Sequence, residues 1–278
     1  MKRIYLHIGM SKAGSTAIQD SLVRNRRALS SAGKCFPEVG RFCNSHYLIY
    51  REFREDRPQL LKQAVAETDH NEVIISDEAF WTLGSNQVKK LAVLLEEYEV
   101  QILLYLRNPW SYVSSSYRQS IKGPGRAETC REHIKRLDGR LDYPALIALW
   151  SSLFDTRVRV YESLREGVVG DFFEAISVPV PTSSSGIRAN TTPHDSVLQF
   201  IWFCNRFFPR RISTLVRRQF SSWQIFIPFL PKISNELLYD YATTEVEKWD
   251  LKRLEDALGR QSVAQLTRLP TETKKKHR

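Results

Sequence analysis

The chain alternates short apolar segments with longer segments of helical pattern, and this alternation limits the folds open to it. Four apolar segments have the length and composition of strands, and the second and third are apolar enough to be buried on both faces. They are residues 3–8, 72–76, 100–106 and 157–161. Helical patterns lie between them, at residues 15–32, 47–67 and 86–98. Strands separated by helices favour parallel crossovers, so we expect an α/β fold with a central parallel sheet flanked by helices.

The pattern changes after the fourth strand. Residues 165–176 predict a helix, which leads into the Pro/Ser/Thr/Gly-rich segment 177–195, and the sequence beyond it is helical or irregular. Segment 177–195 is either an ordered functional loop or a subdomain boundary. A chain of 278 residues is long enough for one large domain. We therefore expect a single domain over 1–278, with an α/β core in 1–176 and a mostly helical part in 177–278.

The composition favours a folded chain that attracts anions. Its hydrophobic content of 42% is enough for a buried core, and 41 Lys and Arg residues against 31 Asp and Glu give a formal charge of +10. This charge predicts attraction to phosphates, nucleic acid, acidic glycans or anionic lipid, without choosing among them. The run Lys274–Lys276 is interpreted as a solvated tail rather than a site.

The four cysteines show no CxxC pair and no short metal-ligand spacing, so we expect free thiols in a reducing compartment and a cytoplasmic protein. The first expected strand begins too early to leave room for a signal peptide. The most apolar late segments, 197–204 and 223–231, are too short to cross a bilayer. They leave peripheral contact with a membrane surface open.

Charged residues follow the first three expected strands directly. Lys12 comes after the first strand, Glu78 after the second and Arg107 after the third. In an open parallel sheet, ligands bind beyond the carboxyl ends of the strands. Three candidate groups at equivalent strand ends therefore predict a site at this edge of the sheet.

The segment HIGMSKAGSTAIQ after the first strand has the features of a phosphate-binding turn. Gly9 and Gly14 permit close backbone approach, and Ser15 and Thr16 open a helix whose free N–H groups favour an anion. The alternative interpretation is a simple helix N-cap. A loop ending in Gly-Lys-Ser/Thr presents its lysine to β- and γ-phosphates beside magnesium. Here Lys12 stands two residues before the second glycine, so we expect it to reach a group attached close to a 5′-phosphate.

Two motifs together resemble those of a known enzyme family. KAGST resembles the 5′-phosphosulfate-binding loop of the sulfotransferases, which use 3′-phosphoadenosine 5′-phosphosulfate (PAPS). The family's second motif binds the 3′-phosphate and has Arg at a strand end with Ser eight residues later. LRNPWSYVSSSY is similar to it through Arg107 and Ser115. Weaker similarity continues through LDYPALIALWSSLF and VRVYESL to WDLKRLEDALG, and it is greatest to bacterial and carbohydrate-type members.

The resemblance implies a P-loop-NTPase-like three-layer fold, with nucleotide binding in 1–176 and a site completed by 177–278. It also implies PAPS as co-substrate, adenosine 3′,5′-bisphosphate (PAP) as product, and no metal. In many members of the family, a late basic loop returns over the nucleotide, and the resemblance places Arg188 in that loop. The nucleotide-binding residues that the resemblance implies are Lys12, Ala13, Gly14, Ser15, Thr16, Arg107, Ser115 and Arg188.

Sulfuryl transfer resembles phosphoryl transfer, in which positioning and electrostatics supply most of the catalysis. Lys12 is expected to neutralise the bridging oxygen as its bond breaks, and the acceptor hydroxyl needs a base. Glu78 stands where family members carry a catalytic His or Glu, although an acid at this place could also cap a helix. Asp77 and His46 are the rival bases, whereas His7, inside the first strand, is interpreted as a core residue.

We therefore expect a PAPS-dependent sulfotransferase that acts on a hydroxyl of a carbohydrate, glycolipid or small molecule. A P-loop kinase or NTPase is the first alternative, in which Asp77 would hold magnesium, but the place of Lys12 argues against it. A basic nucleic-acid-binding protein is the second, because RFFPRR and VRRQF are rich in arginine. No recognised binding motif supports it, so we expect no nucleic-acid partner. The acceptor and the oligomeric state stay open.

Overall fold

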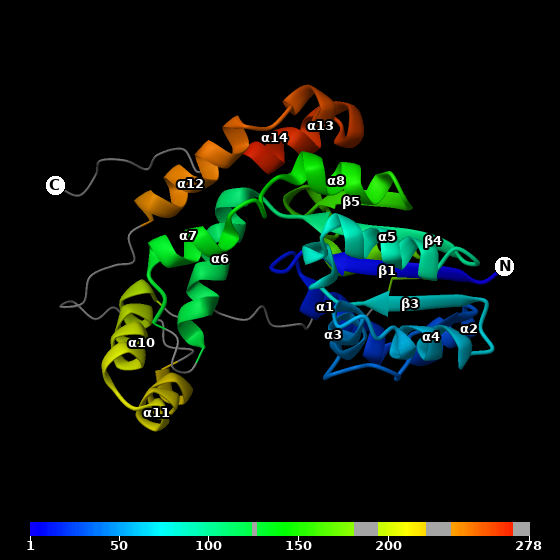
Figure 1. Cartoon of the computed structure of the whole chain (residues 1–278), viewed down its shortest axis with the longest axis horizontal. Helices are drawn as coiled ribbons and strands as arrows, with labels where there is room; N and C mark the ends of the chain where they lie inside the picture. Colours follow the sequence, from blue (N-terminus) through cyan, green and yellow to red (C-terminus); the bar gives the residue numbers. More distant parts are fainter. Residues whose placement is uncertain (124–126, 181–193, 221–234, 269–278) are drawn as a thin grey trace. The chain divides into compact units, whose positions relative to one another are not determined.

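The computed structural model describes residues 1–123, 127–180, 194–220 and 235–268. The chain forms two compact units (Figure 1). The first unit comprises Met1–Asn108, Asp142–Ile187 and Asp250–Arg268, and the second comprises Pro109–Leu141, Arg188–Trp249 and Leu269–Arg278. This division differs from the expected parts 1–176 and 177–278. The helical segment after Asn108 groups with the later helices, and Asp250–Arg268 returns to the first unit.

A parallel sheet of five strands, in the order β2-β3-β1-β4-β5, forms the centre of the first unit (Figure 1). The strands are β1 (Arg3–Gly9), β2 (Lys34–Cys35), β3 (Glu72–Ser76), β4 (Glu99–Leu106) and β5 (Asp155–Val160). β1 pairs with β3 on one side and with β4 on the other, all in parallel. The expected α/β class and parallel sheet are confirmed, and β2 is an additional strand that the sequence pattern did not indicate.

The three central strands are buried on both faces. After its first residue, every residue of β1, β3 and β4 is buried. The edge strand β5 instead alternates between exposed and half-buried positions until Val160, which is buried. Helices supply the cover, with α1 (Ser15–Arg24) packed on α9 (Gly167–Ala175) and α5 (Ser85–Leu94) packed on α8 (Tyr143–Ser151). Continuous apolar runs therefore mark strands that lie between helical layers.

Two of the expected helices are interrupted. The pattern over 15–32 forms α1 and α2 (Arg26–Ser31), and the pattern over 47–67 forms α3 (Tyr47–Arg54) and α4 (Gln59–Ala66). The second break falls at Asp56, whose φ is 56°, and Pro58, which has no N–H to continue a helix. The remaining helical segments among the described residues of the unit are η1 (Phe80–Thr82), η2 (Tyr161–Ser163), α13 (Leu251–Leu258) and α14 (Arg260–Thr267).

The strand order reverses direction at β1 and β4. The chain leaves β1 toward β2 and β3, whereas it leaves β4 toward β5 on the opposite side of the sheet. In open α/β sheets, ligands bind outside the carboxyl ends of the strands at this point. The loop after β1 and Arg107 after β4 occupy it.

The second unit is built from helices in its described residues. They are α6 (Pro109–Lys122), α7 (Cys130–Leu137), α10 (Asp195–Phe207), α11 (Arg210–Phe220) and α12 (Glu236–Glu247). Arg118 on α6 joins two other segments, because its guanidinium pairs with Asp195 at 3.0 Å and donates to the side-chain oxygen of Asn235 at 3.2 Å. Among the helices that are described in either unit, none combines the length and apolarity that a membrane span requires.

Candidate functional site

Two glycines shape the loop between β1 and α1. Gly14 has a φ of 86°, and a Cβ there would lie 2.5 Å from Cγ1 of Val168 on α9. Gly9 has a φ of 106°, and a Cβ there would lie 2.8 Å from the carbonyl oxygen of Glu78. Both positions combine a left-handed backbone with a lack of space, so both require glycine. The glycines hold the loop against α9 on one side and the end of β3 on the other.

The loop leads directly into the amino end of α1. No side chain in the described ranges caps this end. The buried Ser15 hydroxyl donates to the carbonyl of Met10 at 3.2 Å, whereas the side chain of Thr16 is exposed. Amides in the first turn lack intrahelical acceptors and carry the positive end of the helix dipole. This end of α1, with the half-buried Lys12 in the preceding loop, is therefore suited to an anion.

Arg107 connects the end of β4 to this loop. Its guanidinium donates to the backbone carbonyl of Lys12 and lies 5.5 Å from the centre of the Tyr161 ring. Its Nε lies 3.8 Å from Oε1 of Glu162, and no atom of the described residues accepts a hydrogen bond from this buried Nε. Arg107 therefore adds a positive charge beside the loop and retains an unused donor.

Glu162 supports this arrangement, although the sequence analysis did not select it. Its Oε2 accepts a hydrogen bond from the N–H of Asn108 at 3.0 Å. Burial raises the pKa of Glu162, while the Asn108 N–H and the charge of Arg107 act in the opposite direction. Glu162 follows β5, so the strand-end rule that points to Glu78 and Arg107 could have found it.

Glu78 lies half-buried at the end of β3, beside α1. Nε2 of Gln19 on α1 donates to Oε2 of Glu78 at 3.0 Å and makes a longer contact of 3.4 Å with Oγ of Ser76. Gln19 is a second residue that the sequence analysis missed. Its signal is a polar side chain in the buried stripe of α1, between Ile18 and Leu22.

The contacts of Ser76 continue into the core. Its Oγ lies 2.8 Å from Nδ1 of His7, which is fully buried. Burial lowers the pKa of His7 to about 3, so this histidine is neutral. The structure confirms His7 as a core residue, and the contacts from His7 through Ser76 and Gln19 restrict where the Glu78 carboxylate can point.

His46 has no ring nitrogen left for a substrate. Its Nδ1 accepts from the N–H of Ser76 at 3.1 Å, and its Nε2 donates to the carbonyl of Pro37 at 3.0 Å. Burial lowers its pKa to about 4. His46 therefore connects its loop to the end of β3, and this geometry removes it from the candidate bases.

Asp77 is buried, and its Oδ1 accepts a hydrogen bond from the N–H of Ala79 at 2.8 Å. Burial raises its pKa from 3.8 to about 6, with the nearby Glu78 acting in the same direction. Asp77 closes the turn after β3 and is less accessible than Glu78, which is half-buried.

The buried carboxyl of Asp77 should make stability depend on pH. Between the unfolded pKa of 3.8 and the folded pKa of about 6, the folded chain binds more protons, so the free energy of unfolding falls as pH rises. Asp77→Asn removes the titrating carboxyl, and with it this fall in the free energy of unfolding, but keeps a side-chain oxygen that can accept the N–H of Ala79. We expect its stability relative to the native chain to increase by up to about 3 kcal/mol between pH 4 and pH 7. Urea unfolding across this range measures the difference. Asp69→Asn, at an exposed position, should follow the native profile, and an Asp77→Asn profile parallel to the native one would contradict the assignment.

The structure brings together the loop Lys12–Thr16, Glu78 and Arg107 at the carboxyl edge of β3, β1 and β4. Ser115 is half-buried on α6 in the second unit, and Arg188 lies outside the described residues. Their roles in nucleotide binding stay predictions. The four cysteines form no disulfide, and within the described ranges no three His, Cys, Asp or Glu side chains gather to hold a metal ion.

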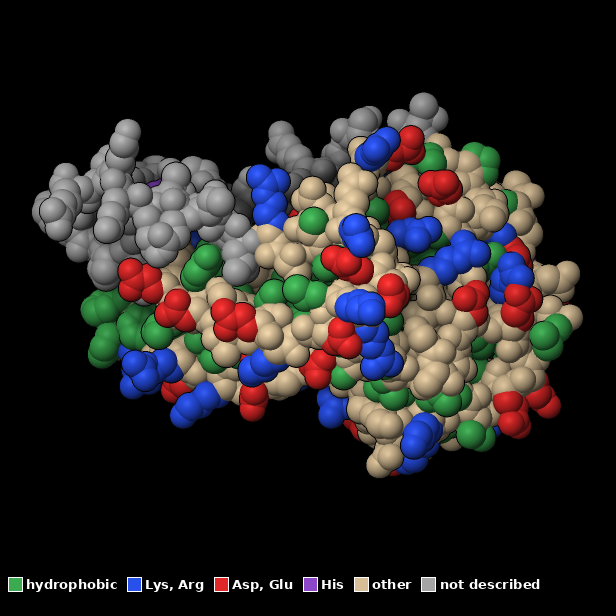
Figure 2. Space-filling model, turned by 90° about the horizontal axis from the view of Figure 1, so that it is seen from above, with side chains coloured by type: hydrophobic (Ala, Val, Ile, Leu, Met, Phe, Trp, Pro, Cys, Tyr) green, Lys and Arg blue, Asp and Glu red, His purple; other side chains and the backbone are tan. Residues whose placement is uncertain are grey.

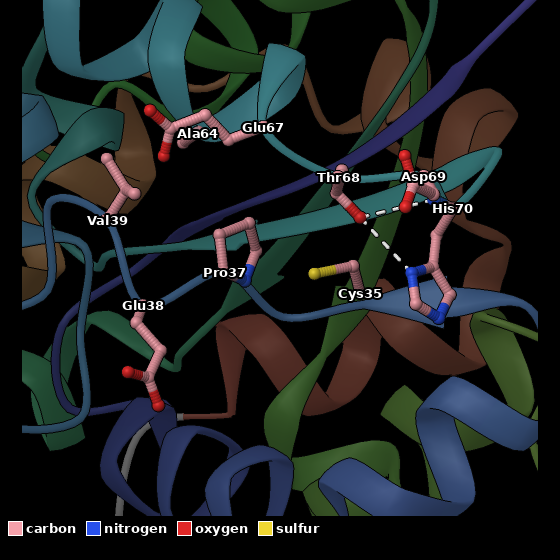
Figure 3. A pocket seen from close by; sticks show the side chains of 9 residues that line it. All are labelled: Cys35, Pro37, Glu38, Val39, Ala64, Glu67, Thr68, Asp69 and His70. Carbon is pink, nitrogen blue, oxygen red and sulfur yellow. Dashed lines mark hydrogen bonds between the residues drawn. The ribbon is translucent and has the colours of Figure 1, made fainter.

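A cavity of about 310 Å³ lies elsewhere in the first unit, beside β2 (Figure 3). The Cys35 thiol points toward Pro37, and Oγ1 of Thr68 lies 3.2 Å from Nδ1 of His70 (Figure 3). The other ring nitrogen of His70, Nε2, lies 3.0 Å from Oγ of Ser30. The carboxylates in its lining disfavour an anion, and none of the predicted site residues borders it. The lining residues are Cys35, Pro37, Glu38, Val39, Ala64, Glu67, Thr68, Asp69 and His70.

Comparison with known proteins assigns no activity to the chain. It matches no protein-family model and no solved structure. Over 115 residues it is 30% identical to an uncharacterized protein of Archaeoglobus fulgidus. The matched part covers 39% of this chain and 31% of the length of the archaeal protein.

Proposed function

We propose that the protein is a PAPS-dependent sulfotransferase with a P-loop-NTPase-like fold, which transfers a sulfuryl group to a hydroxyl of a carbohydrate or glycolipid. The contact of Arg107 with the Lys12 carbonyl, at the switch point of the sheet, carries the proposal. It concentrates two cations and the amino end of α1 at one place. A donor that carries phosphate and sulfate at its 5′ position matches this charge.

Each group has a defined task in the proposed reaction. The first-turn amides of α1 hold the 5′-phosphate, and Lys12 approaches the oxygen that bridges phosphorus and sulfur. The acceptor oxygen forms a bond to sulfur while the bond from sulfur to the bridging oxygen breaks, and PAP leaves with the electron pair. Glu78 takes the proton from the acceptor hydroxyl.

Accessibility favours Glu78 over Asp77 as the base. Glu78 is half-buried and held by Gln19, whereas Asp77 is 2% exposed and its Oδ1 accepts the N–H of Ala79. A base must come within hydrogen-bond distance of the proton it removes. Glu78 meets this condition with a smaller rearrangement than Asp77 requires.

A P-loop kinase is the second candidate, because Asp77 follows β3, the strand next to β1, where a magnesium-binding carboxylate would be useful. The two proposals differ in their nucleotide. A sulfotransferase recognises a 3′-phosphate, here through Arg107, and needs no γ-phosphate. A kinase needs ATP and magnesium.

The expected nucleotide is therefore PAP or PAPS. We expect PAP to raise the melting temperature far more than AMP or ATP does, without magnesium, because at equal concentration a ligand that binds the folded state more tightly stabilises it more. Arg107→Ala should weaken PAP binding by about 1.5–3 kcal/mol, the range for a hydrogen bond to a charged group. Thermal shift and titration calorimetry measure both effects.

Arg3→Ala is a suitable control, since Arg3 lies at the opposite end of β1 and pairs with Glu99. Its PAP affinity should equal that of the native chain. Equal stabilisation by ATP with magnesium would move the assignment to a kinase, and no stabilisation by any adenine nucleotide would remove both.

A further inference from the structure

The turn between α10 and α11, in the second unit, exposes a continuous run of apolar and basic side chains. Every residue from Arg206 to Ile212 is exposed. Phe207 is 65% exposed and Phe208 is 45% exposed, and α11 continues the apolar surface with Leu215 at 65%. Isolated exposed apolar residues are ordinary, but a contiguous group of this kind marks an interaction surface.

The aromatic rings of the turn form one group. The Phe203 and Phe207 rings, one helical turn apart on α10, lie 4.8 Å from each other, and the Phe208 ring lies 6.2 Å from that of Phe203. Ile212 and Leu215 are three residues apart on α11, so they share one face of that helix. We call this set the turn surface. Its apolar members are Phe203, Phe207, Phe208, Ile212 and Leu215.

Arginines alternate with the apolar members along this segment of the chain. Residues 203–220 contain no Asp or Glu. Among the side chains that the structure describes in this segment, the exposed arginines are Arg206, Arg210, Arg211 and Arg218. None of these four forms an ion pair with an acid in the part of the chain that the structure describes, although Glu132 is close enough to Arg206 for their charges to interact. At the left of the view in Figure 2, hydrophobic side chains lie beside Lys and Arg side chains, and Asp and Glu side chains are also visible there.

We propose that the turn surface docks on an anionic lipid bilayer. In such an interface, aromatic and aliphatic side chains enter the boundary between headgroups and acyl chains, and arginines bind lipid phosphates. The turn surface supplies both components within one short segment. The surface belongs to the second unit, and its docking does not depend on the activity proposed above.

Charge and composition favour a bilayer over a second copy of the chain and over a nucleic acid. In a symmetric contact between two copies, each surface meets its own equivalent, which would bring arginines of both copies together. Phosphates of a nucleic acid would satisfy the arginines but would give no apolar environment to Ile212 and Leu215. An anionic bilayer provides negative charge at its surface and apolar chains beneath it.

Co-sedimentation of the full chain with vesicles tests the proposal. We expect binding to vesicles of phosphatidylcholine with phosphatidylglycerol, weak binding to phosphatidylcholine alone, and release as salt screens the charges. Arg210→Gln with Arg211→Gln should weaken binding about fivefold for each arginine removed. Phe207→Ser with Phe208→Ser should weaken vesicle binding at least about tenfold, because the variant lacks the two aromatic rings that would enter the apolar part of the bilayer.

Two variants of α5 provide matched controls. Val93→Ser removes an apolar side chain that is 67% exposed, close to the 65% of Phe207, and Lys89→Gln removes an exposed cation. Both should bind vesicles as the native chain does. Circular dichroism and thermal melting establish that every variant is folded.

Three results would overturn the proposal. The first is vesicle binding that none of the turn variants reduces. The second is a dimer in sedimentation velocity that Phe207→Ser with Phe208→Ser converts to monomer, which would assign the surface to a second copy. The third is retention of DNA or RNA, without vesicle binding, that Arg210→Gln with Arg211→Gln abolishes.

Discussion

Glu78→Gln should lower turnover about 10²- to 10⁴-fold and leave PAP affinity nearly unchanged, which is the effect of removing a general base. The substitution preserves the size of the side chain and an oxygen that can accept from Gln19. It removes only the group that can take a proton. Steady-state turnover with labelled PAPS and calorimetric titration with PAP separate the two quantities.

Lys12→Ala and Gln19→Leu provide the comparison. Lys12 is proposed to meet the donor in both the ground state and the transition state, so its loss should reduce both affinity and turnover. Gln19 acts through Glu78, so Gln19→Leu should reduce turnover by a smaller factor than Glu78→Gln and leave PAP affinity unchanged. Near-normal turnover of Glu78→Gln, with Asp77→Asn inactive, would transfer the base to Asp77.

Gly14→Ala should destabilise the first unit by about 2–5 kcal/mol. The left-handed backbone costs a residue with a Cβ about 1–2 kcal/mol. The contact of that Cβ with Val168, at 2.5 Å, adds an overpacking cost of about 1–3 kcal/mol. PAP affinity should fall too, because the loop must move to relieve the contact. Urea unfolding and titration with PAP measure these effects.

Two further variants separate the backbone cost from the contact. Gly33 has a φ of 73° and open space around its missing Cβ, so Gly33→Ala should show the backbone cost alone. Val168→Ala, added to Gly14→Ala, should restore the share of the free energy of unfolding that the Cβ contact removes. The two substitutions should therefore show a favourable coupling in a double-mutant cycle. Equal stability of Gly14→Ala and the native chain would show that the loop does not have the described geometry.

The sequence predicted the sheet because its central strands are apolar throughout, a pattern that burial on both faces requires. It did not predict β2, which has only two residues and begins with a lysine. Lys34 is nevertheless buried, since it pairs with Glu72 on β3 and lies 5.4 Å from the centre of the Tyr5 ring. A charge neutralised by a residue distant in sequence leaves no local signal.

The site was predictable to the extent that it depends on strand ends. Lys12, Glu78 and Arg107 are adjacent because parallel strands place their carboxyl ends at one edge. Gln19 reaches Glu78 across 59 residues of chain, and Glu162 reaches the N–H of Asn108 across 54, so spacing could not predict either contact. The two nitrogens of His46 are likewise taken by backbone groups, a fact that only the folded chain reveals.

The division into units was only partly predictable from composition. The Pro/Ser/Thr/Gly-rich segment 177–195 suggested a boundary, and the contacts place one within it, between Ile187 and Arg188, but they also place one immediately after Asn108. α6 continues directly from the loop after β4 without glycine or a run of polar residues. The chain therefore passes from the first unit to the second at the start of α6, at a point that the local composition does not mark.

The central place of β1 in the sheet also decides when the site can form during synthesis. β1 ends at Gly9 and pairs with β3 and β4, which begin at Glu72 and Glu99, so about 60 residues must follow β1 before it gains its first partner and about 90 before it gains its second. At about 5–20 residues per second, this interval lasts several seconds. During these seconds, the apolar strand β1, which leads into the loop that carries Lys12, has no neighbouring strand to pair with. A ribosome-bound chain that ends before Glu99 should therefore depend on chaperones more than one that ends after Leu106.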